Sequence, residues 1–375
     1  MKYKVTYLRE VVSFISKGIA PKYVEKDSID SVRVVNQRCN RNNRISLQNS
    51  RLNNLKMRNV PKIKYLHKGD ILINSTGVGT AGRVAQIKEN FDKPVTFDGH
   101  MILIRGNSQI DSLFLGYYLE KNQRVIEQFA EGSTGQTEIN RERLLDELVI
   151  KFPTSVDEQR RLAEKFRLLD RKIDLNNQIN DNLLKLAREQ YKKIIASSVL
   201  VETKLEDFAI IIMGQSPNSK TYNEKGIGIP LLNGAADFRD GIHPKKWTTD
   251  PKRIVNKGAY IFGVRATVGL TTKVYDNYAI GRGTGSAVAK DVTNDEFLYF
   301  VLEDMFKYFA NTASGSVYIN ISKNDFEEYT FYKPQDKELE LFHKIINPIM
   351  KKIYTNKEEN LILTQIKKSL LNYFL

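Results

Sequence analysis

Residues 31–69 carry the most distinctive chemistry of this sequence, because they are rich in basic and amide side chains and include no Asp or Glu. Arginine, asparagine and glutamine match the hydrogen-bonding edges of guanine and adenine in the major groove, and lysine suits phosphate. The alternative is a solvated basic loop, although a merely solvated surface usually mixes both signs of charge. The stretch therefore predicts a nucleic-acid contact, with the candidates Arg33, Arg38, Asn40, Arg41, Asn43, Arg44, Arg51, Lys56 and Arg58.

A second group of basic and aromatic side chains lies in the other half of the chain, where acidic residues interrupt it. By its place in the sequence it corresponds to the first group, so we predict that it contacts the same kind of ligand. Its members are Lys220, Tyr222, Lys245, Lys246, Trp247 and Arg253, with Arg265 and Arg282 in nearby loops. The sequence leaves open which residues of either group read bases and which contact phosphates.

The sequence has no recognisable motif for catalysis or for metal binding. Gly77–Gly82 fits G-x-G-x-x-G, but the residues that follow are poor helix formers, so a strand–turn–strand is favoured over a nucleotide site. The four histidines, His67, His100, His243 and His343, have no metal-ligand spacing. We therefore expect no catalytic residue and no metal site. A DNA nuclease or methyltransferase with an unrecognised active site stays the alternative, because acidic residues and lysines are common.

Composition sets the broad class. The chain has 375 residues, of which 41% are hydrophobic and 27% charged, as in folded proteins of more than one domain. Its net charge of +14 favours a polyanionic partner. The longest apolar run, 208–213, is too short to cross a membrane, no signal peptide is evident, and Cys39 has no second cysteine to pair with. We expect a cytoplasmic protein with no membrane contact.

The chain is an imperfect tandem repeat. Gly18-Ile19-Ala20-Pro21 corresponds to Gly214-Gln215-Ser216-Pro217, and Lys68–Ile73 corresponds to Lys257–Phe262. A period this long indicates two copies of one domain rather than a solenoid. Each copy begins with short strand-like runs and ends in a long helix, so the predicted order is a domain at 1–155, a helix at 156–198, a domain at 199–334 and a helix at 335–375.

The two long helices predict a coiled coil. Apolar residues recur at alternating steps of four and three in both copies, and each seam is interrupted by two asparagines at matching places. Two ordinary core helices are the alternative, but matched polar interruptions favour a shared seam. Antiparallel pairing about a pseudo-two-fold axis would place Asn176 opposite Asn360 and Asn180 opposite Asn356. The predicted fold class is α+β: two tandem α/β domains, each followed by a long helix, with the helices paired as an antiparallel coiled coil.

Several motifs resemble the specificity subunits of type I restriction-modification systems, and the resemblance covers essentially the whole chain. The similar segments are Gly214–Pro217 for G-x-[ST]-P, Lys68–Leu72 for K-G-D-I-L, Gly132–Asn140 for the loop near each domain's end, Phe152–Arg160 for P-x-x-x-E-Q, and Leu169–Asp174 for L-D-x-K-I-x. The second copy departs from this pattern, because it has Lys337-Glu338 without Glu-Gln and Met350–Ile353 without the Asp.

The resemblance implies a non-catalytic reader of double-stranded DNA. In this family each target-recognition domain reads one half of a split site, while the paired helices set the spacer and dock two methyltransferase (M) subunits. Restriction/motor (R) subunits join the full complex, which methylates adenine and cleaves DNA. This chain would bind no cofactor itself, and S-adenosylmethionine, ATP and Mg would belong to its partners. A purely structural coiled-coil adaptor is a third class, against which the acid-free stretch argues.

Overall fold

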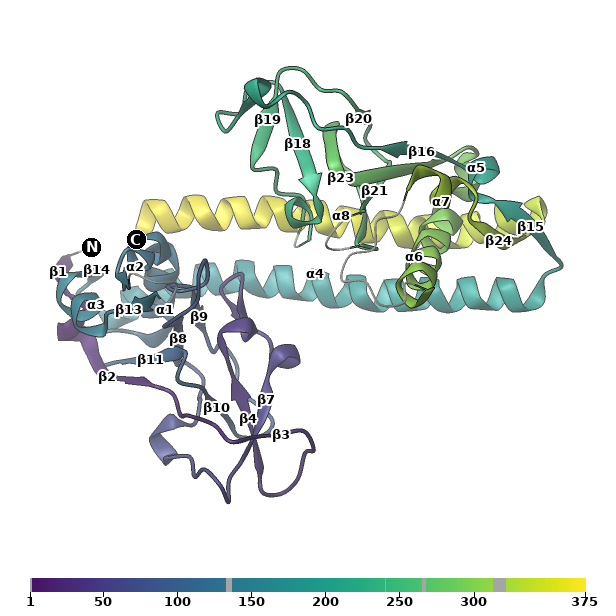
Figure 1. Cartoon of the computed structure of the whole chain (residues 1–375). Coiled ribbons are helices and arrows are strands. Elements are labelled where there is room, and N and C mark those ends of the chain that lie inside the picture. Colours follow the sequence, from purple (N-terminus) through teal and green to yellow (C-terminus); the bar gives the residue numbers. More distant parts are fainter. Residues whose placement is uncertain (1, 133–136, 240, 265–267, 313–321) are drawn as a thin grey trace. The chain divides into compact units, whose positions relative to one another are not determined.

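The computed structural model describes all of the chain except residues 1, 133–136, 240, 265–267 and 313–321. The chain divides into two compact units, which are residues 1–171 together with 364–375 (unit 1), and residues 172–363 (unit 2). Figure 1 labels the helices and strands of both units.

Two four-stranded sheets form the body of unit 1. The antiparallel sheet has the order β2 (Val12–Lys17), β11 (Met101–Gly106), β8 (Ile71–Asn74) and β9 (Val84–Gln86). The mixed sheet has the order β10 (Val95–Phe97), β4 (Ser31–Val35), β7 (Arg51–Asn54) and β3 (Tyr23–Val24). Every residue of β8 is buried, which agrees with the apolar run Ile71–Ile73, because neither face of this strand meets water.

Three strand pairs complete the β-structure of unit 1. They are β1 (Tyr3–Tyr7) with β14 (Val149–Pro153), β5 (Asn40–Arg41) with β6 (Arg44–Ile45), and β12 (Ala130–Glu131) with β13 (Glu138–Ile139). The helices are α1 (Ser112–Lys121), α2 (Gln123–Glu127) and α3 (Arg141–Glu147), with short 3-10 turns η1 (Leu8–Val11), η2 (Gln37–Cys39), η3 (Leu47–Asn49) and η4 (Lys62–Lys64). The Asp111 carboxylate caps α1 by accepting from the backbone N–H of Phe114.

Both long helices enter the core of unit 1. Phe166 near the start of α4 (Val156–Ser197) and Leu371 near the end of α8 (Asp336–Phe374) belong to one buried cluster with Phe114 of α1. Gln159 of α4 is fully buried, and its amide donates to the carbonyl oxygens of Gln109 and Pro153. The first domain is therefore fastened to the beginning of one long helix and the end of the other.

Unit 2 is built on one eight-stranded sheet. Its order is β17 (Tyr222–Asn223), β19 (Lys246–Thr248), β18 (Ile229–Gly234), β23 (Tyr278–Ala289), β21 (Tyr260–Gly263) and β22 (Thr271–Lys273), while β16 (Ala209–Met213) and β20 (Ile254–Val255) also pair with β23. A separate pair joins β15 (Leu200–Lys204) to β24 (Thr330–Pro334). The repeated Gly-x-x-Pro motif has the same steric reason in both copies: a Cβ on Gly214 would lie 2.1 Å from the Gly281 carbonyl oxygen, and one on Gly18 would lie 2.2 Å from that of Asp98.

Aromatic side chains dominate the core of unit 2. The shorter helices are α5 (Leu205–Phe208), α6 (Asp295–Thr312) and α7 (Lys323–Glu327), with 3-10 turns η5 (Ser219–Thr221), η6 (Ala235–Asp237) and η7 (Val292–Asn294). Tyr191 of α4 stacks on Phe300 of α6 with ring centroids 4.9 Å apart, and Phe342 of α8 meets Phe297 edge-on at 5.8 Å. The second domain is thus packed against the end of α4 and the beginning of α8.

The long helices pair antiparallel within unit 2. Asn176 donates from Nδ2 to Oδ1 of Asn360 at 2.9 Å, and Asn356 donates from Nδ2 to Oδ1 of Asn180 at 2.8 Å. From Asn176 to Asn180 along α4, the partners in α8 go backwards from Asn360 to Asn356. This is the order that antiparallel pairing of α4 and α8 requires (Figure 1). The predicted fold class, two tandem α/β domains with long helices in an antiparallel coiled coil, is confirmed.

Candidate nucleic-acid interface

The hairpin formed by β5 and β6 presents two arginines of the acid-free stretch. Arg41 lies directly across from Arg44 in the register, and Asn42 and Asn43 form the two-residue turn between them. Both asparagines have positive φ angles, 52° and 58°, which is the backbone conformation of the tight turn that fits the twist of a hairpin. Asparagine tolerates this conformation better than most residues, so the local sequence Arg-Asn-Asn-Arg specifies the turn.

The pairing of Arg41 with Arg44 places like charges opposite each other. Such cross-strand pairs are destabilising unless a negative group lies close by. Arg41 is exposed and Arg44 is half-buried. A phosphate backbone carries negative charge at regular intervals and is the kind of partner that two neighbouring arginines suit.

The asparagines of the hairpin anchor it to the rest of unit 1. Asn43 donates from Nδ2 to the Val84 carbonyl at 2.9 Å and to Oε1 of Gln123 at 3.1 Å. Asn40 has no exposed surface, and its amide donates to Oδ1 of Asn74 and to the Arg83 carbonyl. Asn40 is one of the predicted nucleic-acid contacts. Its burial corrects that prediction, because a side chain enclosed in the domain and engaged in these bonds holds the hairpin in place.

The other candidates of unit 1 do not form one patch. The Arg51 guanidinium lies over the Tyr23 ring at 3.5 Å, and Arg33 donates to Oγ of Ser50 at 3.1 Å. The β4–β7 register places Arg33 opposite Leu52, so Arg33 and Arg51 point to opposite faces of the sheet. Lys56 forms an ion pair with Asp30 at 2.6 Å, just outside the acid-free stretch. Arg38 and Arg58 are exposed.

In unit 2 most of the predicted residues gather at one edge of the large sheet. Strands β17 and β19 pair so that Tyr222 lies opposite Thr248, and the Lys246 ammonium lies 5.8 Å from the Tyr222 ring centroid. Trp247 is on the same strand as Lys246, Lys245 directly precedes it, and Lys220 is exposed on η5 beside β17. The edge therefore combines basic groups with two aromatic rings.

The remaining candidates of unit 2 lie elsewhere. Arg282 is exposed on β23, and its backbone N–H and Nε lie 3.5 Å and 3.4 Å from Oγ of Ser216. The Ser216 hydroxyl, which the first copy lacks because Ala20 takes its place, thus holds this arginine. Arg253 is exposed just before β20. Arg265 lies outside the residues that the structure describes.

Sequence reasoning missed the residues that support the arginines. Tyr23, Gln123 and Ser216 each fix the position of a basic side chain or of the hairpin that carries it. The two-residue turn itself had a signal in the sequence, because Asn-Asn between short extended runs is typical of this hairpin. The supporting contacts had none, since they join residues far apart in the chain.

The motifs examined for catalysis have structural roles. Gly77–Gly82 connects β8 to β9, which confirms a strand–turn–strand in place of a nucleotide-binding helix. Within the described parts of the chain, no three His, Cys, Asp or Glu side chains are grouped so that they could hold a metal ion. No helix in those parts has both the length and the apolar character that crossing a membrane requires.

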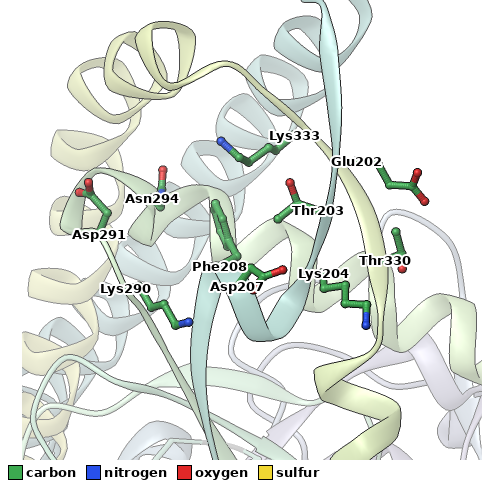
Figure 2. A pocket seen from close by; sticks show the side chains of 10 residues that line it. All are labelled: Glu202, Thr203, Lys204, Asp207, Phe208, Lys290, Asp291, Asn294, Thr330 and Lys333. Atoms are coloured by element: carbon green, nitrogen blue, oxygen red, sulfur yellow. The ribbon is translucent and has the colours of Figure 1, made fainter.

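An open hollow of about 670 Å³ in unit 2 lies apart from these residues (Figure 2). It is bordered by β15, β24, α5 and the turn after β23, and its lining mixes lysines with acidic residues: Lys204, Lys290, Lys333, Glu202, Asp207 and Asp291. Because opposite charges are interleaved and none of the predicted nucleic-acid residues lines it, the hollow is unsuited to a polyanion.

A second surface of interest runs along the long helices in unit 2. Leu175, Ile179 and Leu186 of α4 are exposed. They directly precede the coiled-coil seam residues Asn176, Asn180 and Ala187. Leu341, Ile345 and Ile362 of α8 are exposed too, and they directly precede the seam residues Phe342, Ile346 and Leu363. The ion pair of Lys172 with Glu359 at 3.3 Å joins residues that also directly precede seam residues, so these flanks of the two helices adjoin. The paired helices therefore offer an apolar flank beside the seam.

Comparison with known proteins gives a consistent result. The family model described as "Type I restriction modification DNA specificity domain" matches residues 3–185 and 200–368. The MjaX specificity subunit of Methanocaldococcus jannaschii is 27% identical over 301 residues, which are 74% of this chain and 70% of the relative. The HindI specificity subunit of Haemophilus influenzae is 25% identical over 179 residues, 44% of this chain and 39% of that protein. The crystal structure of an S subunit from M. genitalium, 17% identical, superimposes with a TM-score of 0.57 over 99% of this chain and 95% of that one.

Proposed function

The chain belongs to the family of type I restriction-modification DNA specificity domains and is a specificity subunit with two recognition domains, and we propose that each domain binds one half of a bipartite site in double-stranded DNA. The observation that carries this proposal is the turn that presents Arg41 and Arg44 side by side. Two arginines on a rigid, anchored hairpin can reach phosphates or guanine edges together. A fixed hairpin also costs little conformational entropy on binding.

For the second half-site we propose the β17–β19 edge together with Arg282. Lys246 above Tyr222 supplies charge and a flat ring on one face of this edge, while Trp247, the next residue of the strand, points to the other face. Arg282 would extend the contact from β23, where Ser216 steadies it. The two domains thus use different elements for the same task, which suits two half-sites of different sequence.

We further propose that the apolar flank of the paired helices docks two methyltransferase (M) subunits. Exposed leucine and isoleucine beside a coiled-coil seam are the side chains that additional helices would cover. Restriction/motor (R) subunits would join that assembly, which would methylate adenine and cleave DNA. In this proposal the chain contributes no catalytic group and binds no cofactor, and S-adenosylmethionine, ATP and Mg belong to the partner subunits.

The double charge reversal R41E/R44E tests the DNA proposal in the complex assembled with its methyltransferase partner. Each specific arginine contact is worth about 1–3 kcal/mol, so we expect affinity for the cognate site to fall by at least about tenfold. The control K4E/K151E makes the same change of charge at two exposed residues of β1 and β14. We expect this control to bind nearly as tightly as the wild type. Equal losses in both variants, or no loss in R41E/R44E, would remove the hairpin from the interface.

A further inference from the structure

Asp170 and Lys367 are the buried charged side chains of the two long helices, with 4% and 8% of their surface exposed. In unit 1 the Lys367 ammonium donates to Oδ1 of Asp170 at 2.9 Å and to Oε1 of Glu120 at 2.6 Å. Lys88 and the Tyr117 hydroxyl donate to the other carboxylate oxygen of Asp170. Burial alone would raise the pKa of Asp170, but Lys367 and Lys88 outweigh it and lower the pKa to about 2. The carboxylate is thus charged and fully engaged.

The second copy of the repeat lacks this pair. Met350 takes the place of Asp170 in α8, and Ala187 takes the place of Lys367 in α4. Both are buried in the apolar core of unit 2. The chain therefore has an ion pair at one end of its coiled coil and an apolar contact at the equivalent place of the other end.

The asparagine contacts of the coiled coil are the same in both copies. The Lys172–Glu359 pair has no counterpart, because Ile179 takes the place of Glu359, but it is exposed and therefore contributes little. The asparagines occupy matching places in α4 and α8, so an α4–α4 or α8–α8 pair between two chains would also set asparagine against asparagine. Glu120 likewise has a counterpart in Glu303, which pairs with Arg188 of α4 as Glu120 pairs with Lys367 of α8. The contacts of the asparagines and of the two glutamates fix the register of the helices, but they do not distinguish one partner helix from another.

Asp170 and Lys367 do make that distinction. In an α4–α4 pair Asp170 would face Ala187 of the second chain and keep only the partners from its own domain. In an α8–α8 pair Lys367 would face Met350. Each wrong pair would lose a charged hydrogen bond twice, once at each end. We propose that the Asp170–Lys367 pair selects which long helices associate, so that α4 binds α8 and not its own counterpart in a second copy of the chain. This selection does not depend on DNA reading.

A cleavable version of the full chain tests the proposal. A protease site inserted between Ser198 and Val199 turns the folded protein into a complex of two chains, each with one recognition domain and one long helix. After unfolding in urea and refolding, native mass spectrometry measures which chains pair. For the wild-type sequence we expect mixed pairs to exceed like pairs by at least about tenfold beyond the statistical ratio.

The variant D170M/K367A installs the residues of the second copy at both positions, and we expect its preference for mixed pairs to fall about tenfold. The variant A187K/M350D gives the like pairs a complementary ion pair as well. We therefore expect the same loss of preference for mixed pairs, here because the like pairs gain the contact. The control D157M/K368A makes the same substitutions at exposed residues of the two helices and should keep the wild-type preference. A wild type without preference, or both variants with the full preference, would overturn the proposal.

A measurement on the uncut chain keeps the proposal testable if the cleaved chains do not refold. D170M alone leaves Lys88 and Lys367 buried with Glu120 as their one carboxylate, whereas D170M/K367A removes the excess charge. We expect the single variant to melt about 5 °C or more below the double variant, because an uncompensated buried charge is costlier than an apolar contact. If the single variant melts no lower than the double variant, Lys367 does not depend on Asp170 and the selection by this pair is wrong.

Discussion

Arg41 and Asp170 carry charge in opposite surroundings. Arg41 lies exposed across from another arginine, whereas Asp170 is enclosed with Lys88, Lys367 and the Tyr117 hydroxyl. The first arrangement presents two arginines at one turn, so we propose that it serves binding. The second compensates each buried charge within the fold, so it belongs to stability and to the choice of partner helix.

The lowered pKa of Asp170 makes the stability of unit 1 depend on acidity. A carboxylate with a pKa of about 2 in the folded chain and about 3.9 in the unfolded chain stabilises the fold above pH 4, and this contribution disappears as the pH falls through about 2. We expect the free-energy difference between the wild type and D170N to narrow by about 2 kcal/mol between pH 5 and roughly pH 2. Urea unfolding over this range measures it. With the exposed control D157N we expect no comparable narrowing, and a D170N gap independent of pH would contradict the assignment.

The sequence predicts the arginine-rich stretch as a whole but not the role of each residue in it. Composition was enough to find the arginine-rich stretch, because the lack of acidic residues is visible without a structure. Asn40 and Asn43 belong to the same acid-free stretch as Arg41 and Arg44, so composition does not separate them. Their amides, however, donate to backbone carbonyls inside the domain. The distinction depends on β8 and β9 lying beneath the hairpin, which no local pattern reveals.

At the scale of elements, the coiled coil was the most predictable part of the chain. The spacing of four and three residues locates the seam, and matching midpoints set the asparagines in register. The placement of the domains on the helices was not predictable. The second domain packs against Tyr191 of α4 and Phe342 of α8, so it is held by the helices themselves and not by the link after Ser197.

Because the second domain is held by the long helices, the length of the coiled coil between the two units can be tested as the determinant of the DNA spacer length. We propose inserting seven residues into α4 after Arg171 and seven into α8 before Thr364, at the border of the two units. Each insertion lengthens its helix by about 10 Å and keeps the heptad, so we expect a recognised spacer longer by about one to three base pairs. Mapping of methylated sites measures the spacer. The control insertion after Ser198 should leave it unchanged, and an unchanged spacer in the helix variant would show that the coiled coil does not set the distance.

At the scale of the whole molecule, duplication gave rise to two domains with one task and unequal details. The strand pairs β1–β14 and β15–β24 correspond, as do the glycines at 18 and 214. The candidate DNA residues do not correspond, because those of the first domain include a hairpin tip and most of those of the second lie at a sheet edge. A repeat of this kind predicts independent readers whose half-sites can change separately.

Replacing the first domain while mapping methylated sites tests whether the two domains read their half-sites independently. Residues 1–153 are exchanged for a related recognition domain that keeps counterparts of Lys88 and Glu120, so that its contacts with Asp170 of α4 and Lys367 of α8 are preserved. The chain is produced with its methyltransferase partner, and methylated adenines are mapped across the host genome. We predict a bipartite motif in which one half changes while the other half and the spacer stay the same. A motif in which both halves change, or a motif without two separate halves, would contradict the account.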